Sequence, residues 1–200
     1  MWETEAKLKR CGLGPVAGVD EAGRGPLFGP VLAAAFIPRE IGLPENVNDS
    51  KQLSEREREA IYPSVIDAAA DFAVGLATAA EIDRLNILVA TKLAMKRALR
   101  GLRLKPALVL VDGLCLDGPI PSRKIIRGDA TVGSIAAASI IAKVTRDALM
   151  RGLHRRFPGY HLDRNKGYGT PEHLEALRRL GPTALHRKTF NGVRQPKLVL

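Results

Sequence analysis

Aromatic residues are scarce in this 200-residue chain, at 4% of the sequence, and there are only two cysteines. The hydrophobic fraction is nevertheless 46%, so the core must be built mainly from Ala, Leu, Ile and Val. Cys11 and Cys115 lie far apart, and neither has a second ligand at a metal-binding spacing. These features exclude a disulfide scaffold and a zinc site, and they fit a reducing compartment.

Long apolar runs, internal repeats and low-complexity linkers are also missing. The longest apolar stretches are too short to span a bilayer, and the first ten residues, MWETEAKLKR, contain no apolar signal core. We therefore expect a cytoplasmic, monomeric protein without membrane attachment. Its length suits one domain over residues 1–200.

Positive charge is concentrated in the last third of the chain. The formal net charge is +10, of which a surplus of 9 falls in residues 143–200 and a surplus of 1 in residues 1–142. A localised positive field favours a polyanionic partner such as nucleic acid. The alternative is a solvated basic surface with no such partner.

Short apolar runs bounded by Gly and Pro alternate with helical patterns. They predict five strands, at residues 16–20, 31–37, 72–77, 108–112 and 124–126. Capping residues and apolar periodicity predict helices from Ser54 to about residue 70 with a break or kink at Pro63, over 78–101, over 136–157 and from Thr170 to Gly181. This alternation predicts an α/β fold, a mixed sheet flanked by helices, with a basic and mainly helical part from about 143 to 200.

Four acids stand at the ends of the predicted strands or beside a helix. Asp20 and Glu21 follow an apolar run within GVDEAGRGPLFG, Asp112 ends LVLVD, and Asp129 lies between a short strand and the longest helix. Acids at neighbouring strand ends can converge, and converging carboxylates require a cation to neutralise their repulsion. Mg²⁺ and Mn²⁺ prefer oxygen ligands, and two such ions can catalyse phosphoryl displacement. We therefore predict a divalent-metal site that cuts nucleic acid, against the alternative of helix caps and surface ion pairs.

Glycines and one tyrosine are candidates for substrate recognition. The backbone of Gly23-Arg24-Gly25 could approach a 2′-hydroxyl closely, because glycine has no Cβ; a simple turn is the alternative. Tyr168 stands between Gly167 and Gly169, where it could stack on a sugar or base, or anchor a loop.

Polar and basic residues elsewhere are candidates for phosphate contacts. Ser50 and Lys51 lie in a polar loop that could hold a phosphate near the cut, or could simply be solvated. Lys143 and Arg146 are expected to bind duplex phosphates. Asp147 is expected to pair with Lys143 across one helical turn and is left out of the metal set. His186 has no carboxylate partner in the sequence to support a general-base role.

The ordered segments of the chain resemble bacterial type 2 ribonuclease H. The resemblance covers about residues 18–190 and is carried by the following segments: GVDEAGRGPLFGPV, DSKQLSEREREAI, LVDG, GDATVGSIAAASIIAKVTRD, FPGYHLDRNKGYGTPEHLEAL and GPTALHRKTF. It implies a ribonuclease H-like fold and a four-acid metal site formed by Asp20, Glu21, Asp112 and Asp129. Phe28, where a small residue is common, and Gln52, where lysine is common, depart from the family pattern without removing a ligand.

The same resemblance implies an activity and a means of recognition. Enzymes of this family cut RNA in RNA/DNA hybrids and single ribonucleotides in duplex DNA, on the 5′ side, leaving 3′-hydroxyl and 5′-phosphate ends. Their GRG backbone contacts the 2′-hydroxyl, and their tyrosine packs on the deoxyribose that follows. Whether the protein also binds a DNA clamp is not decided by the sequence.

Two other classes of protein compete with this interpretation. A duplex-coating protein would gain nothing from four acids near its phosphate surface. Type 3 ribonucleases H carry an extra N-terminal domain, whereas 17 residues precede Gly18 here, and transposases normally need additional DNA-binding regions.

Overall fold

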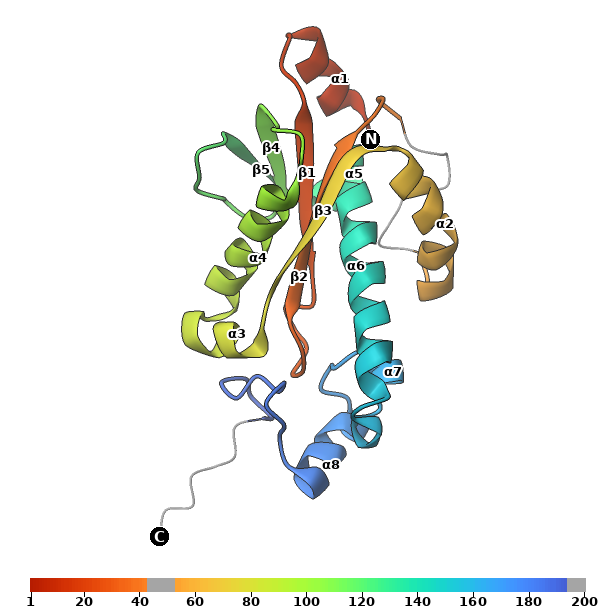
Figure 1. Ribbon diagram of the computed structural model, residues 1–200, viewed down its shortest axis with the longest axis vertical. Coiled ribbons are helices and arrows are strands. Elements are labelled where there is room, and N and C mark those ends of the chain that lie inside the picture. Colours follow the sequence, from red (N-terminus) through yellow and green to blue (C-terminus); the bar gives the residue numbers. More distant parts are fainter. Residues whose placement is uncertain (43–52, 194–200) are drawn as a thin grey trace.

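The computed structural model describes residues 1–42 and 53–193, and its centre is a five-stranded mixed sheet. The strand order is β3-β2-β1-β4-β5, in which β1 pairs antiparallel with β2 and parallel with β4. The strands are β1 Val16–Ala22, β2 Val31–Pro38, β3 Ala69–Ala77, β4 Leu108–Asp112 and β5 Ser122–Ile125. The mixed sheet and its flanking helices confirm the predicted α/β class (Figure 1).

Helices cover both faces of the sheet. α4 (Ile87–Gly101) packs on one face against Val19, Ala33 and Val111, and α6 (Gly133–His154) packs on the other against Ala34 and Phe36. The remaining helices are α1 Glu3–Arg10, α2 Glu55–Asp67, α3 Ala79–Leu85, α5 Gly128–Thr131, α7 Leu162–Asn165 and α8 Pro171–Leu180, with a 3₁₀ turn at Pro158–Tyr160. No helix within residues 1–42 and 53–193 is long and apolar enough to cross a membrane.

Two glycines bring a helix backbone directly against the sheet. A Cβ on Gly18 of β1 would lie 2.2 Å from the Ser134 carbonyl carbon of α6, and one on Gly75 of β3 would lie 2.3 Å from the Ala94 carbonyl oxygen of α4. Because such distances are impossible for real atoms, any side chain at either position would push the helix away from the strand. The sheet is therefore held between two helices by contacts at which no side chain intervenes.

The N-terminal helix closes the start of α6. Glu5 is buried, and its Oε1 accepts the backbone N–H of Ser134 at 2.8 Å, while the Met1 carbonyl accepts the N–H of Gly133 at 3.0 Å. These bonds satisfy N–H groups that the first turn of any helix leaves without intrahelical acceptors. The Trp2 ring lies against Gly133, where a Cβ would lie 2.2 Å from its Cε2 atom.

Several element boundaries differ from the sequence-based expectation. β1 continues through Asp20 to Ala22, because the ladder to β2 extends to the pair Ala22 and Leu32. α2 is capped by Ser54 as expected but passes through Pro63 without a break. The expected helical region over 78–101 consists of two helices divided at Asn86, whose φ of 69° ends α3 and whose side chain caps α4. α6 begins three residues earlier than expected and ends before Phe157.

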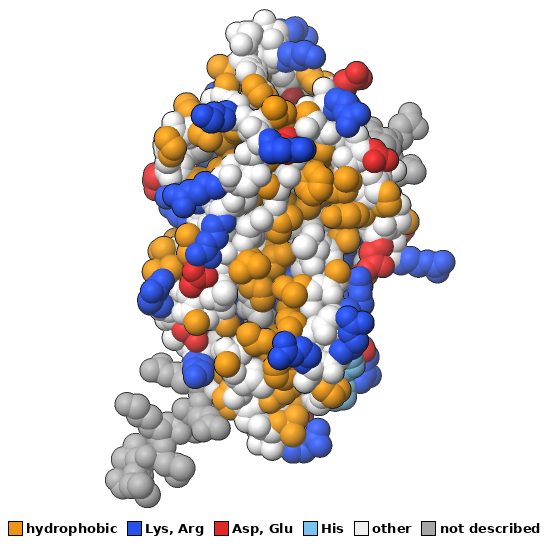
Figure 2. Space-filling model, viewed as in Figure 1, with side chains coloured by type: hydrophobic (Ala, Val, Ile, Leu, Met, Phe, Trp, Pro, Cys, Tyr) orange, Lys and Arg blue, Asp and Glu red, His pale blue; other side chains and the backbone are white. Residues whose placement is uncertain are grey.

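The surface over β3 is apolar. Alternation along this edge strand leaves Phe72, Val74 and Leu76 between 36% and 40% exposed, while Gly75 and Ala77 are buried. Figure 2 shows hydrophobic side chains gathered down the middle of this face, with Lys and Arg side chains on either side. The positive charge of the chain therefore flanks an apolar strip on this face.

Candidate active site and nucleic-acid interface

Two of the candidate acids lie on adjacent strands at the same level of the sheet. Asp20 on β1 and Asp112 on β4 follow the parallel pair Val19 and Val111. Since side chains alternate along a strand, both aspartates lie on the α6 face, together with Gly18. Glu21 is the next residue of β1. Its carboxylate forms an ion pair with Arg24 at 3.1 Å, and its backbone N–H donates to Asp20 Oδ1 at 2.7 Å.

Asp129 lies in the same region because the side chain of Asp112 binds the backbone of the residue that precedes Asp129. Oδ1 of Asp112 accepts the N–H of Gly128 at 2.6 Å, and Gly128 is the first residue of α5. Asp129 is the next residue and is 2% exposed. The end of β4 therefore fixes the helix that carries the fourth acid.

Burial and the repulsion between neighbouring carboxylates make ionisation of Asp20 and Glu21 unfavourable. The pKa of Asp20 is raised well above its usual value, first by burial and then by the negative charges of Glu21 and Asp112. Burial also raises the pKa of Glu21, against a smaller opposite effect of Arg24. Oε2 of Glu21 is buried without a hydrogen-bond partner among the described residues. A bound cation would stabilise the ionised carboxylates and would give Oε2 of Glu21 a partner.

The donors present suit a hard divalent cation, because all of them are carboxylate oxygens. No three Asp, Glu, His or Cys side chains in the described part of the chain are arranged as a ready-made metal site. A bound ion would therefore have to draw the carboxylates closer together. The assignment of Asp20, Glu21, Asp112 and Asp129 as ligands stays a prediction.

A buried arginine, Arg187, donates hydrogen bonds to backbone carbonyls of the segment that follows Glu21. Arg187 is fully buried, and its guanidinium donates to the carbonyl of Gly23 at 2.6 Å, of Arg24 at 2.8 Å and of Gly29 at 3.0 Å. In a trans peptide the N–H points away from the C=O. The N–H groups of Arg24 and Gly25 therefore point outward, and neither has an intramolecular acceptor in the part of the chain described. The two carbonyls of Gly23 and Arg24 are already used by Arg187.

A second buried arginine corrects one sequence-based expectation. Arg146 is 2% exposed and donates to the carbonyls of Lys166 at 3.0 Å, Phe28 at 3.3 Å and Pro30 at 3.4 Å. Its expected role as a phosphate contact is wrong, because its donors face the protein interior. A Cβ on Gly23, whose φ is +91°, would lie 2.0 Å from Arg146 Nε, so this arginine also requires a glycine in the bend.

Tyr168 lies beside the glycine bend and is accessible. Its side chain is 49% exposed, and a Cβ built on Gly25 would lie 3.4 Å from its Cε1 atom. The adjoining loops are joined by the N–H of Leu27, which donates to the Gly167 carbonyl at 2.8 Å. The structure thus places the two recognition candidates, far apart in sequence, side by side.

The other candidates are divided among different parts of the molecule. Lys143 lies half-buried on α6. Asp147 pairs with Arg58 of α2 at 3.9 Å, so the expected pair with Lys143 is wrong; a partner on another helix was not visible from the spacing. Ser50 and Lys51, with Gln52, lie outside the described residues.

His186 and Phe28 both belong to the packed C-terminal part. His186 is 1% exposed and contacts the ring of Phe28, which is fully buried. A buried imidazole cannot reach a substrate, so a general-base role is excluded in this conformation. Phe28 packs behind the bend, within a cluster that includes Met150 and Tyr160.

Arg187 is the functional candidate that sequence reasoning missed. In the sequence it is one of the basic residues that make up the positive surplus of residues 143–200. Its neighbours in GPTALHRKTF give no periodic signal that would distinguish a buried guanidinium from a surface one.

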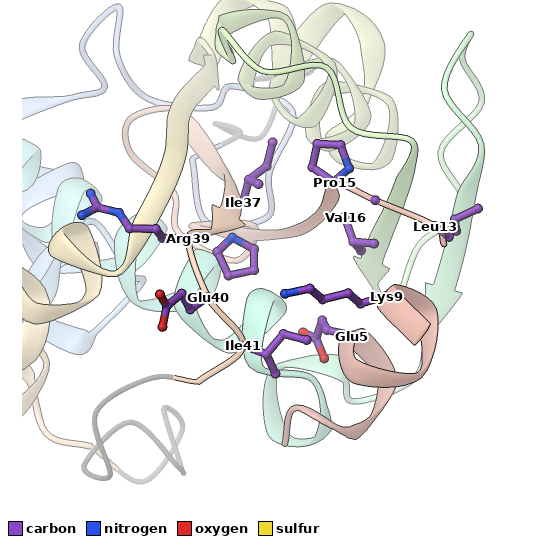
Figure 3. Close-up of a pocket in the computed structure, with 11 residues that line it drawn as sticks. Glu5, Lys9, Leu13, Pro15, Val16, Ile37, Arg39, Glu40 and Ile41 are labelled. Carbon is purple, nitrogen blue, oxygen red and sulfur yellow. The ribbon is translucent and has the colours of Figure 1, made fainter. Parts of the chain in front are cut away.

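A separate pocket lies at the opposite end of β1 from the acids. Its lining mixes acids and bases from α1 and from the end of β2, as Figure 3 shows: Glu5, Lys9, Leu13, Val16, Ile37, Arg39, Glu40 and Ile41. Glu5 is already engaged at the start of α6. This pocket does not gather carboxylates and is distinct from the acid site.

Comparison with protein families gives one match that spans most of the chain. The profile described as Ribonuclease HII matches residues 17–193. A relative described as Ribonuclease HII, from Desulfitobacterium hafniense (strain Y51), is 54% identical over 182 residues, which are 90% of this chain and 70% of the relative.

Solved structures give the same fold. The ribonuclease H2 of Pyrococcus horikoshii OT3 aligns with a TM-score of 0.74 and 32% identity, over 90% of this chain and 95% of that one. The ribonuclease HII in a complex with PCNA from Archaeoglobus fulgidus aligns with a TM-score of 0.72 and 25% identity, over 92% and 98%. The Bst ribonuclease HIII in complex with Mn²⁺ shares the fold at a TM-score of 0.66 and 19% identity, over 90% and 69%.

Proposed function

Because this chain belongs to the ribonuclease HII family, and is thus a hydrolase that cuts RNA in RNA/DNA hybrids, we propose that it also cuts single ribonucleotides in duplex DNA. Cleavage falls on the 5′ side of the ribonucleotide and leaves 3′-hydroxyl and 5′-phosphate ends. Such a reaction starts the removal of ribonucleotides from DNA in the cytoplasm.

The acid site supplies the ligands for this chemistry. We assign Asp20, Glu21, Asp112 and Asp129 as ligands of Mg²⁺ or Mn²⁺, two ions per site during catalysis. Divalent ions held by these four carboxylates would supply the charge that activates a water molecule and that offsets the negative charge on the leaving oxygen of an in-line displacement. The protein contributes by fixing β1, β4 and α5 relative to one another, through the strand ladder and the Asp112–Gly128 hydrogen bond. Oε2 of Glu21, which is buried and has no hydrogen-bond partner within residues 1–42 and 53–193, supports this assignment.

The glycine bend and Tyr168 supply the recognition. The outward N–H groups of Arg24 and Gly25 can donate to a 2′-hydroxyl oxygen, which deoxyribose lacks. Tyr168 can pack on the sugar of the next nucleotide, where a 2′-hydroxyl would be excluded. The observation that carries the proposal is the proximity of the Tyr168 ring to Gly25, which lies three residues after the end of β1 at Ala22 and four residues after Glu21. One substrate can therefore contact the metal ligands, the backbone of the glycine bend and the ring of Tyr168.

Affinity for the duplex comes from its phosphates. Lys143, with Ser50 and Lys51, is assigned to phosphate contacts, which give affinity without sequence preference. We expect the chain to act as a monomer. A sliding clamp is a reasonable partner, given that a relative of the same fold was solved in complex with PCNA.

A cleavage map tests the proposal directly. A DNA duplex with one ribonucleotide, labelled at either end, is incubated with the protein and Mg²⁺ or Mn²⁺, beside an all-DNA duplex of the same sequence. We expect one cut, 5′ to the ribonucleotide, and no cut in the control. Asp129→Asn should keep binding to a hybrid but lose cleavage; full activity of that variant would remove Asp129 from the metal site.

The tyrosine has its own test. Tyr168→Ala should reduce cutting at a single ribonucleotide about tenfold, which is a loss of about 1.4 kcal/mol and lies near the low end of what one aromatic stacking contact contributes, and it should leave metal binding unchanged. An unchanged rate on that substrate would rule out the stacking role. Tyr62→Ala, which removes a tyrosine ring of α2 that packs against the core on the α6 side of the sheet, is the control for the loss of a tyrosine side chain.

A further inference from the structure

A chain of hydrogen bonds through two buried histidines ends on the backbone of Tyr168. The N–H of Thr183 donates to His186 Nδ1 at 2.9 Å, the Nε2 atoms of His186 and His173 are 3.2 Å apart, and His173 Nδ1 lies 2.8 Å from the Tyr168 carbonyl oxygen. His173 is fully buried and His186 is 1% exposed. The chain therefore joins the segment after α8 to the loop that carries the sugar-contacting tyrosine.

The backbone groups at the two ends fix the tautomers of both rings. His186 accepts at Nδ1, so its proton is on Nε2, which donates to His173 Nε2. His173 then carries its proton on Nδ1 and donates it to the Tyr168 carbonyl, which can only accept. Each neutral ring has one donor and one acceptor, and both are used. Protonation of either ring would break one of the bonds.

The surroundings of the two rings favour this neutral, fully bonded arrangement. Aromatic rings of Phe28 and Tyr160 lie with centroids 4.7 Å and 4.9 Å from that of His186. Tyr160 is itself held, because its hydroxyl donates to the Gly181 carbonyl at 2.6 Å. An imidazole nitrogen left without a partner in such a site would bear the full cost of its desolvation, so the arrangement with all four nitrogens bonded is favoured. The relay is thus rigid.

We infer that His173 and His186 are positioning residues that hold Tyr168 against Gly25 and so set selectivity for the RNA-to-DNA junction. Neither imidazole reaches the substrate; they act through the Tyr168 carbonyl. The inference rests on the proposed contact of Tyr168 with the sugar. It assigns these histidines a role in substrate choice, beyond their contribution to packing.

Paired substitutions at His173 separate the hydrogen bond from the packing. His173→Phe keeps an aromatic ring but removes the donor to Tyr168, whereas the amide of His173→Asn can replace Nδ1–H. We expect His173→Phe to lower kcat/KM on a single-ribonucleotide duplex about tenfold relative to a long RNA/DNA hybrid, and His173→Asn to recover most of that ratio. His154→Asn, at the end of α6 outside the relay, should leave the ratio unchanged.

A double-mutant cycle tests whether the effect passes through the tyrosine. In a Tyr168→Ala background, His173→Phe should lower single-ribonucleotide cleavage no further, because the group being positioned is gone. A full additional tenfold loss would overturn the inference and assign His173 a general structural role. If Tyr168→Ala itself has no effect, the proposed sugar contact fails instead.

A measurement on the unaltered protein keeps the inference testable if the variants do not fold. Long-range ¹H–¹⁵N spectra of the histidine rings distinguish the two neutral tautomers. The relay requires the Nδ1–H form for His173 and the Nε2–H form for His186 at pH 7. The opposite tautomer at either ring, or a charged ring, would overturn it.

Discussion

Asp112 accepts the backbone N–H of Gly128 at 2.6 Å, so the acid at the end of β4 also holds the first residue of α5. The same side chain therefore serves two purposes, as a proposed metal ligand and as an acceptor that fixes the position of Asp129. Separate substitutions can distinguish these purposes, because an amide keeps an acceptor oxygen and a methyl group does not.

Asp112→Asn should fold normally but lose cleavage. The amide oxygen can still accept the Gly128 N–H, while the charge needed for a divalent ion is gone. We expect at least a hundredfold loss of kcat, with a melting temperature within a few degrees of the original. Asp112→Ala should also leave a backbone N–H without its acceptor and cost about 1–3 kcal/mol of unfolding free energy. Equal stability of the two variants would show that this hydrogen bond does not hold α5.

Arg187→Lys should destabilise the protein and loosen the glycine bend. The planar guanidinium reaches three carbonyls at once, whereas a buried ammonium group is compact and cannot match that geometry. We expect a loss of about 2–4 kcal/mol in denaturant unfolding and a lower kcat/KM at single ribonucleotides. Arg178→Lys, an exposed position on α8, is the control and should change neither.

Gly23→Ala should be more damaging than its size suggests. The new methyl group would collide with Arg146 Nε at 2.0 Å, and the residue would keep a φ of +91°. We expect about 2–3 kcal/mol of destabilisation, from backbone strain together with displacement of a buried guanidinium. Gly12→Ala provides the comparison, since its φ is +72° but its surroundings are open. A similar loss in both variants would mean that the contact with Arg146 contributes nothing.

His186 should make the protein less stable as the pH falls. Burial, and then the neighbouring His173, lowers the pKa of His186 from 6.5 to about 4. Between these values the unfolded chain binds a proton that the folded chain does not, so unfolding becomes more favourable as the pH decreases from 6.5 to about 4. Above pH 6.5 both states are neutral and this contribution to stability is fully present.

The corresponding measurement is the difference in unfolding free energy between the original chain and His186→Gln over pH 4–7. Acidic groups common to both proteins cancel in that difference. We expect the original chain to lose more stability than His186→Gln on acidification. Parallel pH curves would mean that His186 titrates equally in both states.

The sheet and its main helices could be predicted from the sequence because they depend on local patterns. The apolar run at Leu108–Asp112 and the capping residues Ser54, Thr78 and Thr170 identified a strand and three helix starts correctly. Boundaries were less accurate where tertiary contacts decide them. The extension of β1 to Ala22 depends on its partner Leu32, and the division at Asn86 depends on a left-handed backbone that no periodicity signals.

Within the candidate site, only the residues with distinctive sequence neighbours could be predicted. Acids that end apolar runs stand out, and so does a tyrosine between glycines, whose exposure is confirmed. Arg146 and Arg187 could not be assigned in advance, because an arginine that donates to carbonyls has the same sequence signature as one on the surface. Of their six carbonyl acceptors, five belong to residues more than a hundred positions away, and only Lys166, an acceptor of Arg146, is nearer.

The direct contact between Gly18 and α6 sets the separation of β1 from that helix by the radii of peptide groups, independently of side-chain volume. Asp20 lies two residues further along the same face of β1. Substitutions among the aliphatic residues of the core can therefore change the packing of the core while the distance between the Asp20 segment of β1 and α6 stays the same. The position of this proposed metal ligand therefore depends on a residue, Gly18, at which no side chain fits.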